Sequence, residues 1–428
     1  MDFIDRYLEY TEQSEPQKIY HRWCALTAVG ALLGRNYYIQ QGHFKIYSNL
    51  YVMLLGEAGA RKSTSIKLMK KLISAAGYEN IAADKTTKEK FLLDLEGVDE
   101  DLVDGKAKKY DSVTADNLWG KNSATEPREV FIMADEFNEF AGVGNNEFYT
   151  TLGNLWDWDD EERPFTQRLK NSRSVSIFQP TISILGGNTA ENFARAFPPD
   201  ALATGFLSRM LLIYGEKSGR KFHIIPTPNK EMTDEIITSL RNIRGTMRGA
   251  ATVDDDADAI LREIYNDWGE LEDMRFKGYN NRRYTQLLKL GLICSTTRMS
   301  ARTHSGKQGN HSITASDIIR ANTILTGAEL LMPKALGEIG KSKHSVVINE
   351  IMDLLNTATH PLLMRDIWSR VHKDLDKPTD LAPILQGLVM ADKIHIVKDR
   401  GYLPKAAKVK EHKFVDWSLL TPEERMDI

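Results

Sequence analysis

A glycine-bearing loop between an apolar run and an amphipathic run constrains this chain more than any other stretch. A buried strand followed by such a loop and a helix is the context of a phosphate-binding loop. The glycines let the backbone fold around phosphates, and the amides of the loop and of the helix N-terminus face the anion. The sequence therefore predicts a nucleoside triphosphate site. Between the apolar run 51–55 and the helical run 65–76, its expected contacts are Gly56, Gly59, Ala60, Arg61, Lys62, Ser63 and Thr64.

Three residues of this loop decide how it would hold a nucleotide. Lys62 is expected to reach the outer phosphates, and the Ser63 hydroxyl to bind Mg²⁺. Arg61 stands where the pattern has its last glycine, so its side chain must either point away from the phosphates or contact them. The alternative is a strand-to-helix turn in which the Lys-Ser pair is incidental.

Composition places the chain among globular proteins. Its 428 residues allow two or three domains, and a formal net charge of −3 means that any nucleic-acid surface must be local. Cys24 and Cys294 are far apart and lack His-rich neighbours, so neither a disulfide nor a zinc site is expected. The acidic start and the lack of a long apolar run predict a soluble, cytoplasmic protein with no membrane partner.

The hydrophobic pattern predicts an α/β fold with a mainly parallel sheet flanked by helices. Residues 1–40 look helical, and strand signals disappear between 229 and 340. The expected strands lie at 50–55, 79–83, 130–134, 181–186 and 210–214. The expected parts are a helical lid at 1–44, a nucleotide-binding core at 45–220, a helical subdomain at 221–340, a winged-helix-like domain at 341–408 and a tail at 409–428.

The succession of helices and strands between 345 and 403 is typical of a winged helix. Its expected recognition helix, 379–392, is poor in Lys and Arg, so DNA binding and protein docking are equal alternatives. The charged tail carries Phe414 and Trp417 and is expected to be either a disordered end or a partner-binding peptide.

Two adjacent carboxylates end the apolar run 130–134. Asp135 can complete the Mg²⁺ shell, and Glu136 can orient the water that attacks the γ-phosphate, because phosphoryl transfer depends mostly on positioning and charge stabilisation. An apolar strand that simply ends in a solvated Asp-Glu turn is the alternative. The two carboxylates indicate a nucleotide site only in combination with the upstream glycine loop.

Two further candidates follow the carboxylates. Asn188 comes after the apolar run 181–185 and would lie beside the γ-phosphate if this strand runs between the other two; a plain Gly-Gly-Asn turn is the alternative. Arg209 directly precedes the strand 210–214 and suits insertion into a neighbouring subunit's nucleotide site. Arg195 competes for that role, and a surface salt bridge is the alternative for either.

Residues 163–178 form two extended runs around an Asn-Ser turn and predict a hairpin. No acid lies within 163–173, so the hairpin is a candidate for phosphate contacts with single-stranded DNA; a solvated charged hairpin is the alternative. The expected DNA-binding residues are Arg168, Lys170 and Arg173.

The order of these motifs resembles the AAA+ ATPases, and more narrowly the hexameric replicative helicases and primase-helicases of phages and related mobile elements. The motifs GEAGARKST, VFIMADEF, ISILGGNTA and GFLSRMLLIY carry the resemblance within 49–215. It implies ATP and Mg²⁺ as cofactors, and a hexamer in the cytoplasm of a bacterial host. The implied roles are Walker A for Lys62 and Ser63, Walker B for Asp135 and Glu136, first sensor for Asn188, trans-acting finger for Arg209 and pore hairpin for 163–178.

This resemblance leads to an ATP-driven translocase on single-stranded DNA, most simply a replicative helicase, as the expected function. A helicase loader or remodeller that docks a replication partner through the winged helix or the tail is one alternative. An initiator in which ATP only switches assembly is another. No primase segment precedes the core, and Arg282, Arg283 and Arg298 are all available as a second sensor.

Overall fold

The computed structural model describes thirteen stretches of the chain, and they form two compact units. The main unit comprises Met1–Gly337 with Lys413–Ile428, and the small unit comprises Glu338–His412. The described residues are 2–97, 127–168, 174–197, 205–271, 273–303, 312–337, 343–358, 360–373, 375, 377–390, 393–397, 401–404 and 412–425.

A four-stranded parallel sheet is the centre of the main unit, in the order β4-β7-β3-β8. Its strands are apolar and covered on both faces, as expected of a parallel sheet. The predicted α/β class with a parallel sheet is confirmed. The expected strand at 79–83 is not a full strand, because only Ile81 forms an isolated bridge, with Phe131. The four strands are β3 (Tyr51–Gly56), β4 (Glu129–Ala134), β7 (Thr181–Thr189) and β8 (Met210–Tyr214).

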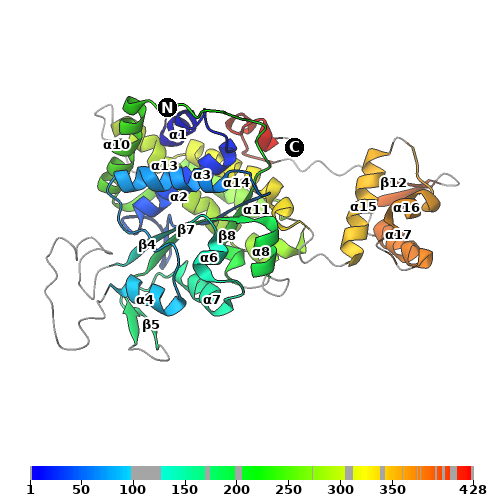
Figure 1. Ribbon diagram of the computed structural model, residues 1–428, viewed down its shortest axis with the longest axis horizontal. Coiled ribbons are helices and arrows are strands. Elements are labelled where there is room, and N and C mark those ends of the chain that lie inside the picture. The colour runs from blue at the N-terminus through cyan, green and yellow to red at the C-terminus, as the bar shows by residue number, and fades with distance from the viewer. Residues whose placement is uncertain are drawn as a thin grey trace. The chain divides into compact units, whose positions relative to one another are not determined.

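Helices cover both faces of this sheet. Figure 1 shows α2 and α3 on one side of the strands and α6 and α7 on the other. The helices of the main unit are α1 (Phe3–Tyr10), α2 (Lys18–Leu33), α3 (Lys62–Ala75), α4 (Lys88–Glu96), α6 (Phe137–Ala141), α7 (Asn146–Leu155), α8 (Ala190–Ala196), α10 (Lys230–Thr246), α11 (Asp255–Asp267), α12 (Lys277–Asn280), α13 (Arg283–Thr303) and α14 (Ala315–Leu336), with the 3-10 turns η2 (Leu207–Arg209), η3 (Met274–Phe276), η5 (Trp417–Leu419) and η6 (Glu423–Arg425).

Helix α2 is an internal helix and not the expected lid. Every residue from Ile19 to Leu33 is buried, and the helix ends at Gly34, which has a φ of +49°. Its neighbours include α1, α3, α10, α13 and the strands β3, β7 and β8 of the central sheet. A mostly apolar helix that is buried on every face belongs inside a core, and its two buried basic residues, His21 and Arg22, both have polar partners.

A second, mixed sheet corrects two further expectations, in the order β10-β9-β1-β2. Strand β1 pairs in parallel with β9 although some two hundred residues separate them in the sequence. Residues 37–40, expected to be helical, therefore lie in a strand, and the stretch 229–340 is not free of strands. The strands are β1 (Tyr37–Gln41), β2 (Phe44–Tyr47), β9 (Gly249–Val253) and β10 (Ser312–Ile313).

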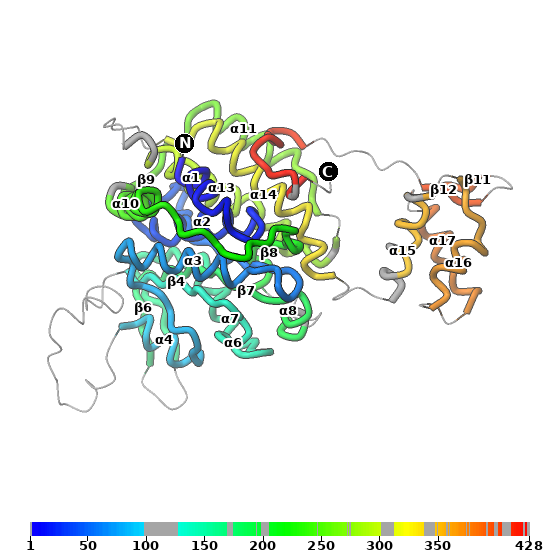
Figure 2. Tube along the Cα trace, turned by 45° about the horizontal axis from the view of Figure 1, so that its top comes forward, coloured from blue at the N-terminus to red at the C-terminus, as the bar shows by residue number. Residues whose placement is uncertain are grey.

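The described C-terminal residues 413–425 pack on the main unit, so they are not the disordered end that was one of the two expectations. Figure 2 shows them in red beside α14. Leu420 is buried, and Arg22 of α2 forms an ion pair of 2.7 Å with Glu424. Both side chains of this pair are at most 5% exposed.

The described residues of the small unit form three α-helices, a 3-10 turn and a two-stranded antiparallel sheet, to which Leu362 adds a bridge with Tyr402. The helices and strands follow one another in the order expected between 345 and 403. Its core is apolar and includes Val347, Ile351, Leu355, Ile367, Val371, Leu381 and Leu385. Its elements are α15 (Lys343–Thr357), α16 (Met364–Val371), η4 (Pro378–Asp380), α17 (Leu381–Met390), β11 (Ile394–Val397) and β12 (Gly401–Pro404).

Candidate nucleotide-binding site

The glycine loop connects the end of β3 to the start of α3, as the sequence predicts. A side chain at Gly56 would collide with the carbonyl of Gly215 and with the hydroxyl of Tyr20, so only glycine fits there. The Tyr20 hydroxyl lies 2.8 Å from the carbonyl oxygen of Leu55 and 2.6 Å from that of Gly215. Helix α2 therefore supports the loop from inside the core.

Arg61 adopts the left-handed backbone conformation, with a φ of +62° and a ψ of +23°. This conformation favours glycine, which explains why a glycine usually occupies this position. The side chain points to Glu15, and Nε lies 2.7 Å from Oε2. The side chain was expected either to point away from the phosphates or to contact them. In the structure it is paired with the carboxylate of Glu15.

Lys62 opens α3 and is buried at the loop. Its ammonium donates to the carbonyl oxygens of Gly56 at 3.0 Å and Glu57 at 2.9 Å. Burial lowers its pKa, and the charge of Glu136 acts in the opposite direction. Lys62 and Glu136 therefore interact electrostatically across the site.

Ser63 and Thr64 occupy the first turn of α3. Ser63 is half-buried and Thr64 is exposed. The Thr64 amide donates to the Arg61 carbonyl at 3.1 Å, whereas Arg61 provides no side-chain cap for the helix. A helix N-terminus with amides that lack intrahelical partners favours an anion.

Asp135 and Glu136 leave the end of β4 at the same edge of the sheet. Asp135 is half-buried, and its Oδ2 lies 2.7 Å from the Lys67 ammonium of α3. Desolvation raises the pKa of Glu136, and the charges of Glu139 and Asp135 add to this effect, while Lys62 opposes it. Oxygen donors such as the Ser63 hydroxyl and the Asp135 carboxylate are chemically suited to Mg²⁺.

Strand β7 lies between the loop strand β3 and the carboxylate strand β4. The prediction that Asn188 lies beside the γ-phosphate required this strand order. Asn188 is level with Leu55, and Gly186 is level with Ala134. The Gly-Gly-Asn stretch is part of this strand and not a turn. A side chain at Gly187 would lie 2.6 Å from the Asp135 carbonyl, so the glycine allows the two strands to approach closely.

Asn138 of α6 fixes the orientation of the Asn188 side chain. Asn138 Nδ2 donates to the Asn192 carbonyl at 2.7 Å, so its Oδ1 is the atom that accepts from Asn188 Nδ2, at 2.8 Å. Asn188 is fully buried, and among the described residues its Oδ1 has no hydrogen-bond partner. An unsatisfied buried acceptor is costly and is typical of functional sites.

Arg209 lies at the opposite edge of the sheet. It precedes Met210, which pairs with the first residue of β3, so about 17 Å of strand separates it from the loop of its own chain. Its guanidinium donates to the Gly205 carbonyl at 2.7 Å and lies 3.3 Å from Asp157. Arg195 is exposed in the last turn of α8, which follows β7 at the loop edge.

The hairpin is present, with β5 (Phe165–Gln167) antiparallel to β6 (Val175–Ile177). Arg168 directly follows β5 and is exposed. Lys170 and Arg173 lie outside the described residues. The hairpin precedes β7, so it emerges from the sheet edge opposite to the loop.

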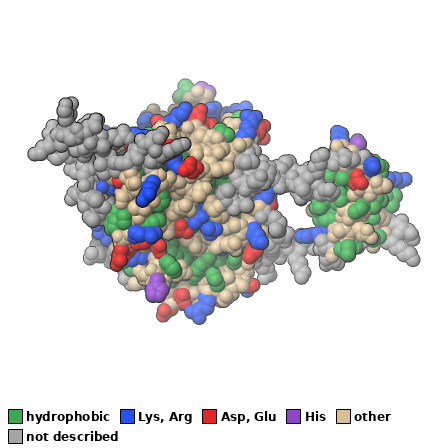
Figure 3. Space-filling model, turned by 90° about the horizontal axis from the view of Figure 1, so that it is seen from below, with side chains coloured by type: hydrophobic (Ala, Val, Ile, Leu, Met, Phe, Trp, Pro, Cys, Tyr) green, Lys and Arg blue, Asp and Glu red, His purple; other side chains and the backbone are tan. Residues whose placement is uncertain are grey.

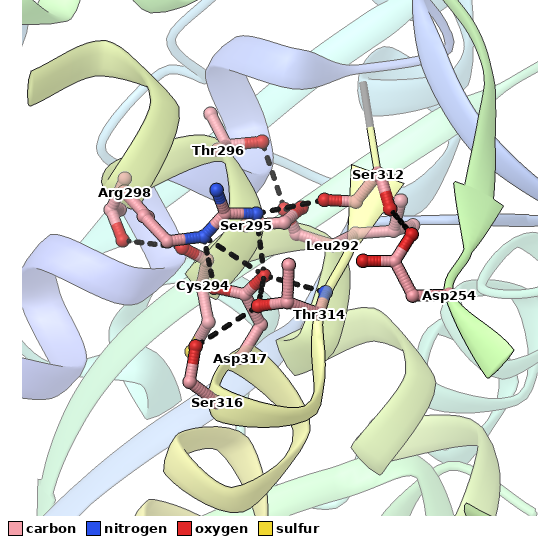
Figure 4. Close-up of polar contacts among 11 residues, drawn as sticks. Asp254, Leu292, Cys294, Ser295, Thr296, Arg298, Ser312, Thr314, Ser316 and Asp317 are labelled. Atoms are coloured by element: carbon pink, nitrogen blue, oxygen red, sulfur yellow. Dashed lines mark hydrogen bonds and ion pairs between the residues drawn. The ribbon is translucent and has the colours of Figure 1, made fainter. Parts of the chain in front are cut away.

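Two of the three second-sensor candidates have structural partners. Arg283 forms a buried ion pair of 2.8 Å with Glu329. Arg298 bonds to Asp317 and to the Ser312 carbonyl in the network of Figure 4. Burial and the charge of Arg209 lower the pKa of Arg282.

Sequence reasoning missed Asn138, Glu15 and Lys67. Lys67 could have been found, because it lies one helical turn after Ser63 in the helix that follows the loop. Asn138 and Glu15 reach the site through contacts that only the tertiary fold determines.

Neither the comparison with protein-family models nor that with curated proteins gives a match for this chain. Among the described residues, no helix is both long and apolar enough to cross a bilayer, and no group of three or more His, Cys, Asp or Glu side chains is arranged so that it could hold a metal ion.

Proposed function

We propose that the chain is an ATPase of the AAA+ type that moves on single-stranded DNA, as a ring-forming replicative helicase does. The observation that supports this most is the strand order, with β7 between β3 and β4. This order gathers Lys62, Glu136 and Asn188 at one edge of the sheet, from three different strand ends. A triphosphate, its Mg²⁺ and an attacking water need such a set of groups.

In this proposal each group has a separate task. Lys62 and the first amides of α3 hold the β- and γ-phosphates, and Ser63 with Asp135 holds Mg²⁺, which neutralises phosphate charge. Asp135 would exchange Lys67 for the metal. Glu136 orients the attacking water, and the unsatisfied Oδ1 of Asn188 is available to accept a hydrogen bond from that water.

The proposed ring and DNA path use the opposite edge of the sheet. Arg209, as the trans-acting finger, would have to leave Asp157 before it could reach a neighbouring subunit; Arg195 is the exposed alternative. The hairpin with Arg168, Lys170 and Arg173 would contact DNA phosphates.

A strand-displacement assay on forked DNA with ATP tests this proposal, and Glu136→Gln is the matched control. We expect unwinding by the natural chain and none by the variant, which should still bind ATP. Lys170→Ala with Arg173→Ala should lose unwinding and keep residual ATPase. Unwinding that survives this double change would refute the hairpin assignment.

A loader or remodeller is the second candidate, and the surface of the small unit favours it. We propose that this unit is a winged helix that docks a protein. Its exposed apolar residues include Leu363, Met390 and Ile396, at 38%, 86% and 61% exposure. Figure 3 shows apolar side chains on its visible face. DNA-stimulated ATPase without any unwinding would favour this candidate.

A further inference from the structure

Arg61, the loop residue with the most unusual backbone conformation, forms an ion pair with Glu15, which lies outside the glycine motif. Arg61 occupies a left-handed position that an arginine rarely adopts, and it is also the residue from which α3 starts. The amides of Thr64 and Ser65 both donate to its carbonyl, at 3.1 and 3.4 Å. The conformation of Arg61 therefore sets the direction of the first turn of α3.

Glu15 is well placed to stabilise that conformation. Its side chain is only 16% exposed, whereas that of Arg61 is 57% exposed. One carboxylate oxygen accepts from Arg61 Nε at 2.7 Å, and the other accepts from the Phe222 amide at 3.3 Å. Ser218 also donates to the Glu15 carbonyl. The segment after β8 thus holds Glu15 in place through contacts other than its ion pair with Arg61.

We propose that Glu15 is a positioning residue of the nucleotide site. By holding Arg61 in the left-handed conformation, it keeps the first amides of α3 and Lys62 in place for the phosphates. This inference rests on the proposed nucleotide site and adds a residue 46 positions before Arg61, outside the loop motif. Glycine at position 61 would make Glu15 unnecessary for this task, because glycine adopts the conformation unaided.

The test is a double-mutant cycle on the full-length chain, with calorimetric titration of ATP and Mg²⁺. We expect Glu15→Ala to weaken binding about tenfold in the natural chain, and the affinity of Arg61→Gly is measured as the reference for the second background. Glu15→Ala in the Arg61→Gly background should have no further effect. Equal weakening in both backgrounds, or no weakening in either, would overturn the proposal. Glu12→Ala is the matched control, because Glu12 lies in the same segment and pairs with Lys18 at 3.6 Å.

A second readout needs no nucleotide and separates this inference from the proposed function. Hydrogen exchange of the Thr64 and Ser65 amides in the nucleotide-free chain should be about tenfold faster in Glu15→Ala. It should be unchanged when Glu15→Ala is added to Arg61→Gly. If the natural chain does not bind ATP but exchange follows this pattern, the proposed function fails and the positioning role stands. If Glu15→Ala does not change the exchange rates of these amides in either background, the positioning role is refuted.

Discussion

Asn188 donates a hydrogen bond of 2.8 Å to Asn138, and this bond leaves the other polar atom of Asn188 buried without a partner among the described residues. The two residues come from adjacent elements of the same sheet edge, β7 and α6. The carbonyl of Asn192 fixes Asn138 in turn. The chain thus holds the amide oxygen of Asn188 in one orientation at the end of β7.

This pair predicts a separation of ATP binding from hydrolysis. Asn188→Ala should lower kcat at least about tenfold, because the residue contacts the reacting water in the proposed mechanism. Nucleotide affinity should change little, since Lys62 and the α3 amides remain. Asn138→Ala should show a smaller loss of kcat through misorientation of Asn188. Steady-state ATPase together with ATP titration checks both; a loss confined to affinity would contradict the assignment.

The close approach of β7 to Asp135 predicts that Gly187→Ala is strongly unfavourable. The added methyl group would lie 2.6 Å from the Asp135 carbonyl, and such overpacking costs about 1–3 kcal/mol. Denaturant unfolding measures the loss. Gly219→Ala is the control, because nothing lies within 4 Å of its Cβ position and its φ is not positive. Equal stability of the two variants would show that the strands can move apart without cost.

His21 predicts loss of stability in acid. Ser14 donates to the Thr11 carbonyl at 2.6 Å, so His21 Nε2 is the donor to Ser14, and the buried Nδ1 has no partner in the described structure. Burial lowers the His21 pKa to about 3, from an unfolded value of 6.5. The unfolded chain therefore binds the extra proton first as pH falls.

Stability should accordingly fall from about pH 6.5 down to about pH 3, by up to about 1.4 kcal/mol per pH unit for this one group. His21→Gln does not titrate, so the difference in unfolding free energy between it and the natural chain should change with pH across that window. Urea unfolding at several pH values measures this difference. A constant difference would show that His21 does not titrate as its burial indicates.

The ion pair between Arg22 and Glu424 predicts how firmly the C-terminal segment is held. Removing one partner, as in Glu424→Ala, leaves a buried charge and should cost about 3–5 kcal/mol. Replacing both by Met and Leu should cost much less. Limited proteolysis of the segment provides the measurement. Equal sensitivity of single and double variants would argue that the pair is incidental to docking.

The sequence was most informative where structure depends on neighbours in the chain. The loop, the strands β3, β4, β7 and β8 and the hairpin follow from local patterns, and so does the order of elements in the small unit. Long-range packing explains the errors. The pairing of β1 with β9, the interior position of α2 and the docking of the tail depend on contacts between distant segments, which a short window of sequence does not contain.

The candidate site also combines residues that local sequence patterns predict with contacts that depend on long-range packing. Lys62, Asp135, Glu136 and Asn188 lie at strand ends, so strand order alone brings them to one edge. Side-chain pairings across the fold were out of reach, such as Glu15 with Arg61 or Arg209 with Asp157. Arg209 shows this most clearly, because its motif predicts a reaching side chain whereas the structure shows it bound within its own chain.

The return of the chain to the main unit after the small unit makes the small unit an insertion fastened at two points. One point is the covalent continuation from α14, and the other is the docked segment 413–425 with Glu424. A single cut between the units before Lys343 would therefore leave the small unit joined to the docked segment, which packing, the ion pair of Arg22 with Glu424 and hydrogen bonds such as that from the Asp416 amide to Thr323 hold on the main unit. A pulling force on the small unit would therefore act on two attachments. One is the end of α14, and the other is the non-covalently docked segment 413–425, from which Glu424→Ala would remove the ion pair with Arg22.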